Sequence, residues 1–357
     1  MNVDQFDFEL PERAIALRPV RPRDSAKLLV LRGGVISDSI VRDLPQQLRA
    51  GDVLVLNDTK VLPAALSALR PARVHGGGGD VTIGINLHQK LSEAEWRAFA
   101  RPAKRLKDGD ELHFSGRLSA QVFDKKEGGD IGLRFSRSGE ALDAEIEALG
   151  HPPLPPYIAR QRAPDARDTA DYQTVYAQDK GSVAAPTAGL HFTPELLAAL
   201  IASDVQITAI TLHVGAGTFL PVKTDNTDDH VMHSEWFTIS PEAASLINKA
   251  KDEGRRVIGV GTTALRALES AANNGRINAQ SRETDIFITP GYQFQIIDGL
   301  MTNFHLPRST LFMLVCALAG TQNMQAAYAH ALSSGYRFYS YGDSSLLWKK
   351  DIRDLAE

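Results

Sequence analysis

Residues 184–222, AAPTAGLHFTPELLAALIASDVQITAITLHVGAGTFLPV, constrain the fold most, because they specify a loop, a helix, a strand and a second loop in succession. Thr193, Pro194 and Glu195 form a helix start, with a hydroxyl cap, a proline at the first position and a carboxylate in the first turn. Residues 205–214 carry little charge and are rich in β-branched side chains, which predicts a buried strand. The segment therefore predicts an α/β unit.

Two loops of small residues, each with a histidine, flank this helix and strand. The loop residues that we predict to bind or act on a substrate are Thr187, Gly189 and His191 before the helix, and His213, Gly215, Gly217 and Thr218 after the strand. Ligands in open α/β sheets bind at the carboxyl ends of strands, where the second loop falls. We therefore predict an active-site cradle, with two ordinary turns as the alternative.

Other predicted strands also end in polar residues. Asn57 and Asp58 follow a strand at 53–56, either as site residues or as a capped turn. Further substrate-binding candidates are Gly261, Thr262, Thr263 and Arg266, where a strand runs into a helix and free N–H groups can bind an anion, and Asn303 and His305. The catalytic candidates are His191, His213, Asp58 and Glu235. The histidines and carboxylates near Glu235 lack the spacing of a metal motif, so we predict no metal.

Chain length and composition predict two domains. A chain of 357 residues is too long for one typical core. From residue 64, short strands alternate with glycine and charge, at 81–87, 96–101, 111–114, 118–123 and 131–135, which is typical of a small barrel. We predict a mixed-sheet α/β main domain formed by 1–63 with 151–357, and an inserted β-barrel domain at 64–150. Within the main domain, 285–289 and 293–297 are predicted to pair as a hairpin.

Charge and cysteine content bound the partners and the compartment. The formal net charge is −4, so a nucleic acid would have to meet a local basic surface. Candidate residues for contacts with a phosphate backbone are Arg101, Lys104 and Arg105 in the insert, and Arg160 and Arg162 after it, with solvated surface charge as the alternative. The lone Cys316 lies in an apolar run far shorter than the roughly 20 residues of a membrane span. With no signal-peptide pattern at the start, we expect a cytoplasmic protein.

Eight segments in order along the chain closely resemble the S-adenosylmethionine:tRNA ribosyltransferase-isomerase family of queuosine biosynthesis. They are VLNDTKVLPA at 55–64, AAPTAGLHFT at 184–193, TLHVGAGTF at 211–219, HSEW at 233–236, GVGTTALRALES at 259–270, TDIFITPGY at 284–292, TNFHLPRSTL at 302–311 and YRFYSYGDS at 336–344. The resemblance implies an α/β domain with an inserted β-barrel. It also implies transfer of the ribosyl part of S-adenosylmethionine to 7-aminomethyl-7-deazaguanine at tRNA position 34.

The reaction implied by this resemblance gives epoxyqueuosine in tRNA, adenine and methionine. S-adenosylmethionine is then a consumed co-substrate, and we expect no cofactor and a monomeric enzyme. A base must remove a proton from the 5′ carbon, which the sulfonium activates, and a proton donor would help adenine to leave. His191 or His213 is favoured as the base over the carboxylates, because a neutral imidazole suits proton removal near pH 7.

Two other classes of function remain open at this point. Residues 259–264 match G-x-G-x-x-A, which would suit a Rossmann-like S-adenosylmethionine methyltransferase or a nucleotide-binding oxidoreductase. The basic residues alone would suit a non-catalytic tRNA-binding module. The products discriminate among these hypotheses, because a methyltransferase releases S-adenosylhomocysteine and a binding module releases nothing.

Overall fold

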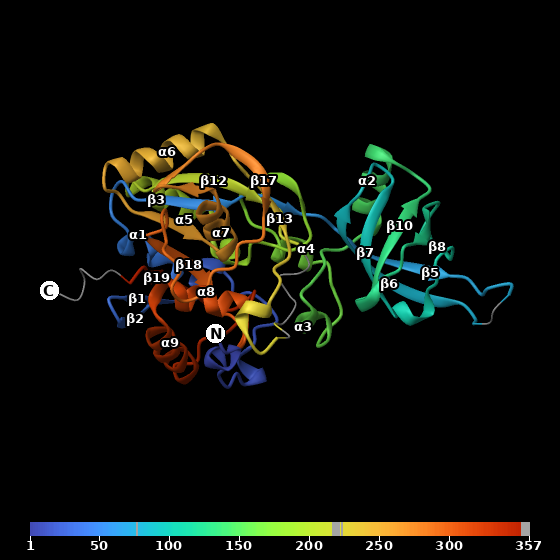
Figure 1. The fold of residues 1–357 in the computed structure, drawn as a ribbon, viewed down its shortest axis with the longest axis horizontal. Coiled ribbons are helices and arrows are strands. Elements are labelled where there is room, and N and C mark those ends of the chain that lie inside the picture. Colours follow the sequence, from blue (N-terminus) through green and yellow to red (C-terminus); the bar gives the residue numbers. More distant parts are fainter. Residues whose placement is uncertain (76–77, 216–221, 223, 351–357) are drawn as a thin grey trace. The chain divides into compact units, whose positions relative to one another are not determined.

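The computed structural model describes residues 1–75, 78–215, 222 and 224–350 of the chain (Figure 1). Gly217 and Thr218, two of the predicted substrate-binding residues, lie outside this description. The chain divides into two compact units, a main unit of residues 1–59, 173–179 and 185–357 and a barrel unit of residues 60–172 and 180–184. The boundaries 1–63 with 151–357, and 64–150, stay a prediction of domain organisation.

The described part of the main unit is built on a nine-stranded mixed sheet with the strand order β17-β13-β12-β3-β14-β18-β19-β1-β2. The strands are β1 (Lys27–Arg32), β2 (Val35–Ile40), β3 (Val53–Asn57), β12 (Gln206–Leu212), β13 (Glu235–Ile239), β14 (Val257–Val260), β17 (Gln280–Thr284), β18 (Gly299–Asn303) and β19 (Ser344–Trp348). Neighbours from β12 through β3 and β14 to β18 are parallel. Their carboxyl ends therefore meet at one edge of the sheet, where α/β proteins place ligands.

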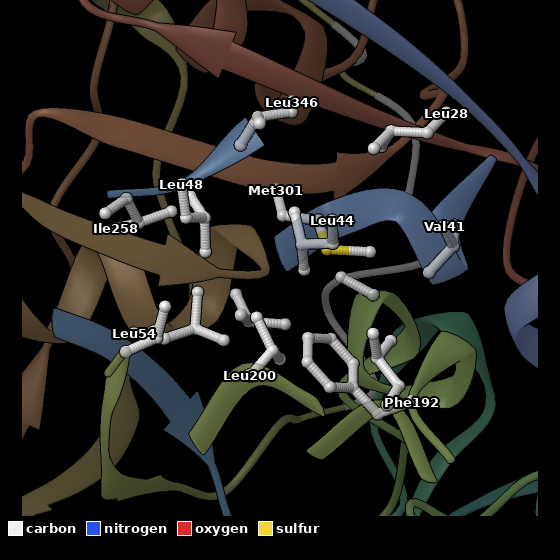
Figure 2. Close-up of a cluster of buried hydrophobic side chains, with 14 of the residues drawn as sticks. Leu28, Val41, Leu44, Leu48, Leu54, Phe192, Leu200, Ile258, Met301 and Leu346 are labelled. Atoms are coloured by element: carbon white, nitrogen blue, oxygen red, sulfur yellow. The ribbon is translucent and has the colours of Figure 1, made fainter. Parts of the chain in front are cut away.

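Helices cover both faces of this sheet. They are α1 (Leu44–Gln47), α5 (Pro194–Ala202), α6 (Pro241–Asp252), α7 (Thr262–Ala271), α8 (Thr310–Ala319) and α9 (Thr321–Ser333). Leu44 of α1 and Leu200 of α5 pack with Leu54 and Met301 on one face (Figure 2). On the other face a side chain at Gly259 would lie 3.6 Å from the backbone nitrogen of Leu265 in α7. The predicted helix start is confirmed, because Thr193 accepts a hydrogen bond from the Leu196 N–H at 3.1 Å.

The barrel unit contains a closed barrel with the strand order β10-β7-β6-β5-β8-β9. Its strands are β5 (Ala65–Arg70), β6 (Val81–Lys90), β7 (Glu95–Arg101), β8 (Glu111–Phe114), β9 (Ser119–Phe123) and β10 (Asp130–Phe135), and the unit also carries α2 (Gly139–Leu149), α3 (Pro156–Ala159) and α4 (Asp168–Asp171). Alternate residues of β6, such as Ile83, Ile85 and Leu87, are buried and fill the interior. The predicted fold class, a mixed-sheet α/β domain with a small β-barrel, is confirmed.

Two short strand pairs complete the described strands: β4 (Thr59–Val61) with β11 (Asp179–Ser182), and β15 (Ala272–Asn273) with β16 (Arg276–Ile277). The predicted hairpin at 285–289 and 293–297 is wrong. The carboxylate of Glu269, 3% exposed, instead accepts the backbone N–H groups of Gln295, Ile296 and Ile297 at 2.9–3.0 Å. A side chain thus replaces the strand partner that the predicted hairpin required.

Among the described residues, no helix is both long enough and apolar enough to cross a membrane. The apolar α8 has only 10 residues. Its Cys316 is 1% exposed, and burial raises the pKa of the thiol to about 12. Because the thiolate is the reactive form, Cys316 acts as a small core residue here.

Candidate active site

Asn57 ties together the carboxyl ends of β3 and β12 and the start of α7. Its side-chain amide donates to the Leu212 carbonyl at 3.0 Å and to the Thr263 hydroxyl at 3.2 Å, while its oxygen accepts from the N–H groups of Leu212 and Thr59. The side chain is fully buried. All of its polar capacity serves this network, so Asn57 holds the strand ends in place rather than facing a ligand directly.

Asp58 belongs to a group of polar side chains just beyond these strand ends. The Thr211 hydroxyl lies 2.7 Å from Oδ1 of Asp58 and 3.1 Å from Oδ2 of Asp179. Burial, with a smaller contribution from the Asp179 charge, raises the pKa of the Asp58 carboxyl above its usual value, against the lowering effect of the Thr211 hydrogen bond. Asp58 is therefore the carboxyl group of this cluster best suited to carry a proton.

His213 lies next to this group, directly after β12. Its Nδ1 is 2.9 Å from the Thr59 hydroxyl, and its backbone N–H donates to the Trp236 carbonyl at 3.0 Å. Burial lowers the pKa of the His213 imidazole, and the Asp179 charge opposes that shift. The imidazole is therefore held neutral near pH 7, as a general base requires. We name Asp58, Thr59, Asp179, Thr211 and His213 the strand-end cluster.

Glu235 and Arg266 form a buried ion pair, with side chains 4% and 5% exposed. The second carboxylate oxygen of Glu235 accepts the Gly215 N–H at 3.0 Å, and Arg266 also donates to the Ile286 carbonyl. The pair thus anchors the start of the second predicted loop to α7. The Glu235 carboxylate is occupied by these partners, which favours a structural role over a catalytic one.

The start of α7 has the backbone geometry that the sequence suggested. Gly261 has φ of +87° and precedes Thr262 and Thr263, which are 7% and 8% exposed. Nearby, Ala188 approaches Gly261, because a Cβ on Gly261 would lie 3.6 Å from the Ala188 methyl group. The first predicted loop therefore packs on the α7 start, and the two elements share one region of the main unit.

Thr187 and Asn303 are brought together by a hydrogen bond between the Thr187 hydroxyl and Oδ1 of Asn303, at 2.8 Å. Asn303 in turn donates to the Tyr339 carbonyl at 3.1 Å. His305 lies two residues further on, 8% exposed, with Nε2 3.2 Å from the Thr302 hydroxyl, and burial lowers its pKa to about 3. The ring is therefore neutral near pH 7, and its buried Nδ1 has no hydrogen-bond partner among the described residues, so substrate binding by His305 stays a prediction.

His191 occupies a different setting from His213. It ends the 3₁₀ helix Thr187–His191, is 4% exposed, and its two ring nitrogens face carbonyl oxygens, of Ala188 at 3.1 Å and of Gly342 at 2.9 Å. Burial lowers the pKa of the imidazole, whereas the two carbonyl contacts raise it. Carbonyl oxygens only accept and a neutral imidazole carries one N–H, so the ring donates to one of these oxygens while the other carbonyl lies against the second nitrogen. No described contact joins His191 to the strand-end cluster.

Close packing leaves no room for a side chain at Gly189. A Cβ at this position would collide with the hydroxyl oxygen of Tyr176 and would lie 3.0 Å from the Thr174 methyl group. We expect Gly189→Ala to lower the free energy of unfolding by about 1–3 kcal/mol, the usual cost of overpacking a core. Urea unfolding measures the change. Tyr176→Phe removes the obstructing oxygen and should restore most of the loss in the double variant; a double variant as unstable as Gly189→Ala contradicts this explanation.

The candidate tRNA-binding residues, all in the barrel unit, fall into two groups. Arg101, Lys104 and Arg105 are exposed at the end of β7 and in the following 3₁₀ turn, and Arg160 is exposed after α3. Arg162 differs, because its guanidinium donates to both carboxylate oxygens of Asp168, at 2.9 and 2.6 Å, and that carboxylate is buried. The charge of Arg162 is already neutralised, so the other four residues are the better candidates for phosphate contacts.

Sequence reasoning missed three members of the strand-end cluster: Thr59, Asp179 and Thr211. Thr59 lies inside the NDTK motif, where its sequence does not distinguish it from an ordinary turn residue, whereas Asp179 lies 120 residues from Thr59 along the chain. A search for polar residues beside β-branched strand ends would have found Thr211. Within the described residues, no group of three or more His, Cys, Asp or Glu side chains is placed to hold a metal ion.

Comparisons with known proteins agree with this architecture. A family model described as queuosine biosynthesis protein matches residues 3–347. Proteins named S-adenosylmethionine:tRNA ribosyltransferase-isomerase from Maricaulis maris and Mesorhizobium japonicum are 62% and 57% identical, over 98% and 99% of this chain and all of theirs. The crystal structure of S-adenosylmethionine tRNA ribosyltransferase from Thermotoga maritima is similar with a TM-score of 0.55 and 34% identity, covering 96% of this chain and 99% of that one. The chain belongs to the queuosine biosynthesis protein family.

Proposed function

We propose that this chain transfers and isomerises the ribosyl moiety of S-adenosylmethionine onto 7-aminomethyl-7-deazaguanine at position 34 of tRNA, releasing adenine and methionine. The observation that carries this proposal is the full-length match to relatives named S-adenosylmethionine:tRNA ribosyltransferase-isomerase. S-adenosylmethionine is consumed, and the reaction has no phosphoryl or hydrolytic step, so we propose that the enzyme uses neither a cofactor nor a metal.

His213 is the base that this arrangement favours for removal of the 5′ proton. The imidazole is half-buried with a lowered pKa, so it is neutral and able to accept a proton near pH 7. Its Nδ1 is engaged by Thr59, whereas no described residue occupies Nε2. By contrast, both ring nitrogens of His191 are engaged by backbone carbonyls.

Asp58 is the residue best suited to supply a proton to the leaving adenine. A neutral carboxyl group can donate a hydrogen bond to a ring nitrogen, and the raised pKa of Asp58 favours that neutral form. The nearby Asp179 carboxylate shares the Thr211 hydroxyl with Asp58, so the two acids repel one another when both are ionised. A base and an acid with displaced pKa values would then lie in one cluster.

The start of α7 is proposed to receive the methionine carboxylate. The N–H groups of the first helical turn and the helix dipole favour an anion there. Thr262 and Thr263 supply hydroxyl groups beside them, and Asn57 fixes Thr263 to the end of β3. Arg266 contributes positive charge one turn later, although Glu235 already pairs with it.

One assay tests the proposed reaction. The protein is incubated with S-adenosylmethionine, labelled separately in adenine, in the ribosyl group and in methionine, and with tRNA carrying 7-aminomethyl-7-deazaguanine at position 34. Free adenine and free methionine in equal amounts are the expected products, with the ribosyl label retained in tRNA. S-adenosylhomocysteine as the product would identify a methyltransferase, and no turnover with saturable tRNA binding would identify a binding module.

Replacing Arg101, Lys104 and Arg105 by alanine is expected to weaken tRNA binding and flatten its salt dependence. Each phosphate contact that is lost removes about 0.7–0.9 from the slope of log affinity against log salt concentration. Filter binding or anisotropy across a salt series measures that slope. Arg117→Ala, which removes an exposed charge elsewhere in the barrel unit, is the control. An unchanged slope in the triple variant would place the tRNA on other residues, Arg160 first.

A cytoplasmic, monomeric enzyme is the form that we propose. The only cysteine is a buried thiol, as suits a reducing compartment. Sedimentation velocity at several protein concentrations tests the oligomeric state, and a mass that rises to twice 38.9 kDa would contradict the proposal.

A further inference from the structure

The hydroxyl group of Thr59 lies between two partners of different chemistry. On one side it is 2.9 Å from Nδ1 of His213, a nitrogen that either donates or accepts according to its tautomer. On the other side it is 3.5 Å from the backbone carbonyl oxygen of Asp179, which only accepts. Thr59 is fully buried, so this hydroxyl has no competing contact with solvent.

A hydrogen bond of the Thr59 backbone fixes the position of its side chain. Its N–H donates to Oδ1 of Asn57 at 3.2 Å, and the same oxygen accepts from the Leu212 N–H at 3.0 Å. Thr59 and His213, each just past the end of a parallel strand, are therefore fixed to one another through Asn57. The distance between the hydroxyl and the imidazole is set by the sheet rather than by a mobile loop.

We propose that Thr59 is a positioning residue, which holds His213 in the tautomer with hydrogen on Nδ1 and leaves the lone pair of Nε2 for a substrate proton. A hydroxyl group carries one hydrogen. When that hydrogen is given to the Asp179 carbonyl, the imidazole must donate from Nδ1 to the Thr59 oxygen. The hydrogen bond at one ring nitrogen thus decides which form the other takes.

Asp179 contributes a second effect through its side chain. Its carboxylate acts on His213 through its charge, favouring the protonated imidazole. After Nε2 takes a proton, the ring becomes a cation, and the neighbouring carboxylate stabilises it. Asp179 thus has two roles. Its backbone carbonyl orients the Thr59 hydroxyl, and its carboxylate stabilises the imidazolium that proton transfer produces.

This inference rests on the proposed function for the role of Nε2, but the tautomer itself is a property of the free protein. Nitrogen-15 NMR of the ring, assigned by the signal that His213→Gln removes, distinguishes a protonated Nδ1 from a protonated Nε2. We expect a protonated Nδ1 in the wild type and in Thr59→Ser, which keeps the hydroxyl. Thr59→Val has the same shape without the hydroxyl, and we expect its His213 to shift toward the Nε2-protonated form.

Kinetics give the matching readout. In Thr59→Val the single-turnover rate of adenine release should fall about 10- to 100-fold, because the base is still present but is no longer held in the reactive tautomer. The KM for S-adenosylmethionine should stay nearly unchanged. Thr59→Ser should stay within about threefold of wild type. A wild-type His213 protonated on Nε2, or a tautomer that Thr59→Val leaves unchanged, would overturn the inference. If the tautomer depends on Thr59 while His213→Ala releases adenine normally, the positioning role stands and the base assignment fails.

Discussion

His213→Ala is expected to lower the single-turnover rate of adenine release by about 10²- to 10⁴-fold at saturating S-adenosylmethionine and tRNA, the usual contribution of general-base catalysis. The reason is that Nε2 would take the 5′ proton, and no other described imidazole combines partial exposure with contact to the strand-end cluster. Because burial lowers the pKa of His213, the wild-type enzyme should lose activity only at pH values below the range in which an ordinary histidine titrates. The rate should therefore fall as the solution becomes more acidic.

Two comparisons make the His213 result specific. His233→Ala removes an exposed imidazole from the loop before β13 and should leave the rate within about threefold of wild type. His191→Ala should act mainly on stability, because it leaves the carbonyl of Gly342 without its buried partner. A His213→Ala enzyme within threefold of wild type would remove the histidine-base hypothesis and pass the role to Asp58.

The elements that were predicted correctly are those specified by local patterns. The start of α5 was visible in Thr193, Pro194 and Glu195, because capping depends on residues within one turn. The barrel strands were visible for a similar reason, since alternation of buried and exposed residues operates over 4–10 positions. Both patterns can be recognised from neighbouring residues alone, without knowing where the rest of the chain lies.

The features that were not predicted depend on partners distant in the sequence. The second carbonyl that engages His191 comes from Gly342, 151 residues away, and converts a catalytic candidate into an enclosed side chain. The hairpin at 285–297 failed because a carboxylate from α7, that of Glu269, satisfies the backbone donors first. Asp179 joined the site only because its strand returns to β4. Composition near a residue cannot reveal such a partner.

The second large effect is expected from Glu235→Ala, which should lower the free energy of unfolding by about 3–5 kcal/mol. Alanine leaves the guanidinium of Arg266 buried without its counter-ion. Water cannot solvate that charge instead, because the Arg266 side chain is only 5% exposed. The Gly215 N–H also loses its acceptor. Chemical denaturation followed by tryptophan fluorescence measures the change, and adenine release is compared per folded molecule.

We attribute the lower free energy of unfolding of Glu235→Ala to the buried, unpaired charge of Arg266 and not to the loss of an ion pair as such. Matched variants separate these two causes. Asp252→Ala breaks an exposed ion pair, in which the side chains of Arg276 and Asp252 are 57% and 55% exposed. Such exposed pairs stabilise a protein by only about 0–1 kcal/mol. Replacing Glu235 by leucine and Arg266 by methionine together removes both charges and should recover much of the stability lost by Glu235→Ala. If Glu235→Ala is instead as stable as wild type but releases adenine 100-fold more slowly with an unchanged KM, the carboxylate acts on the substrate, and the structural role assigned to it is wrong.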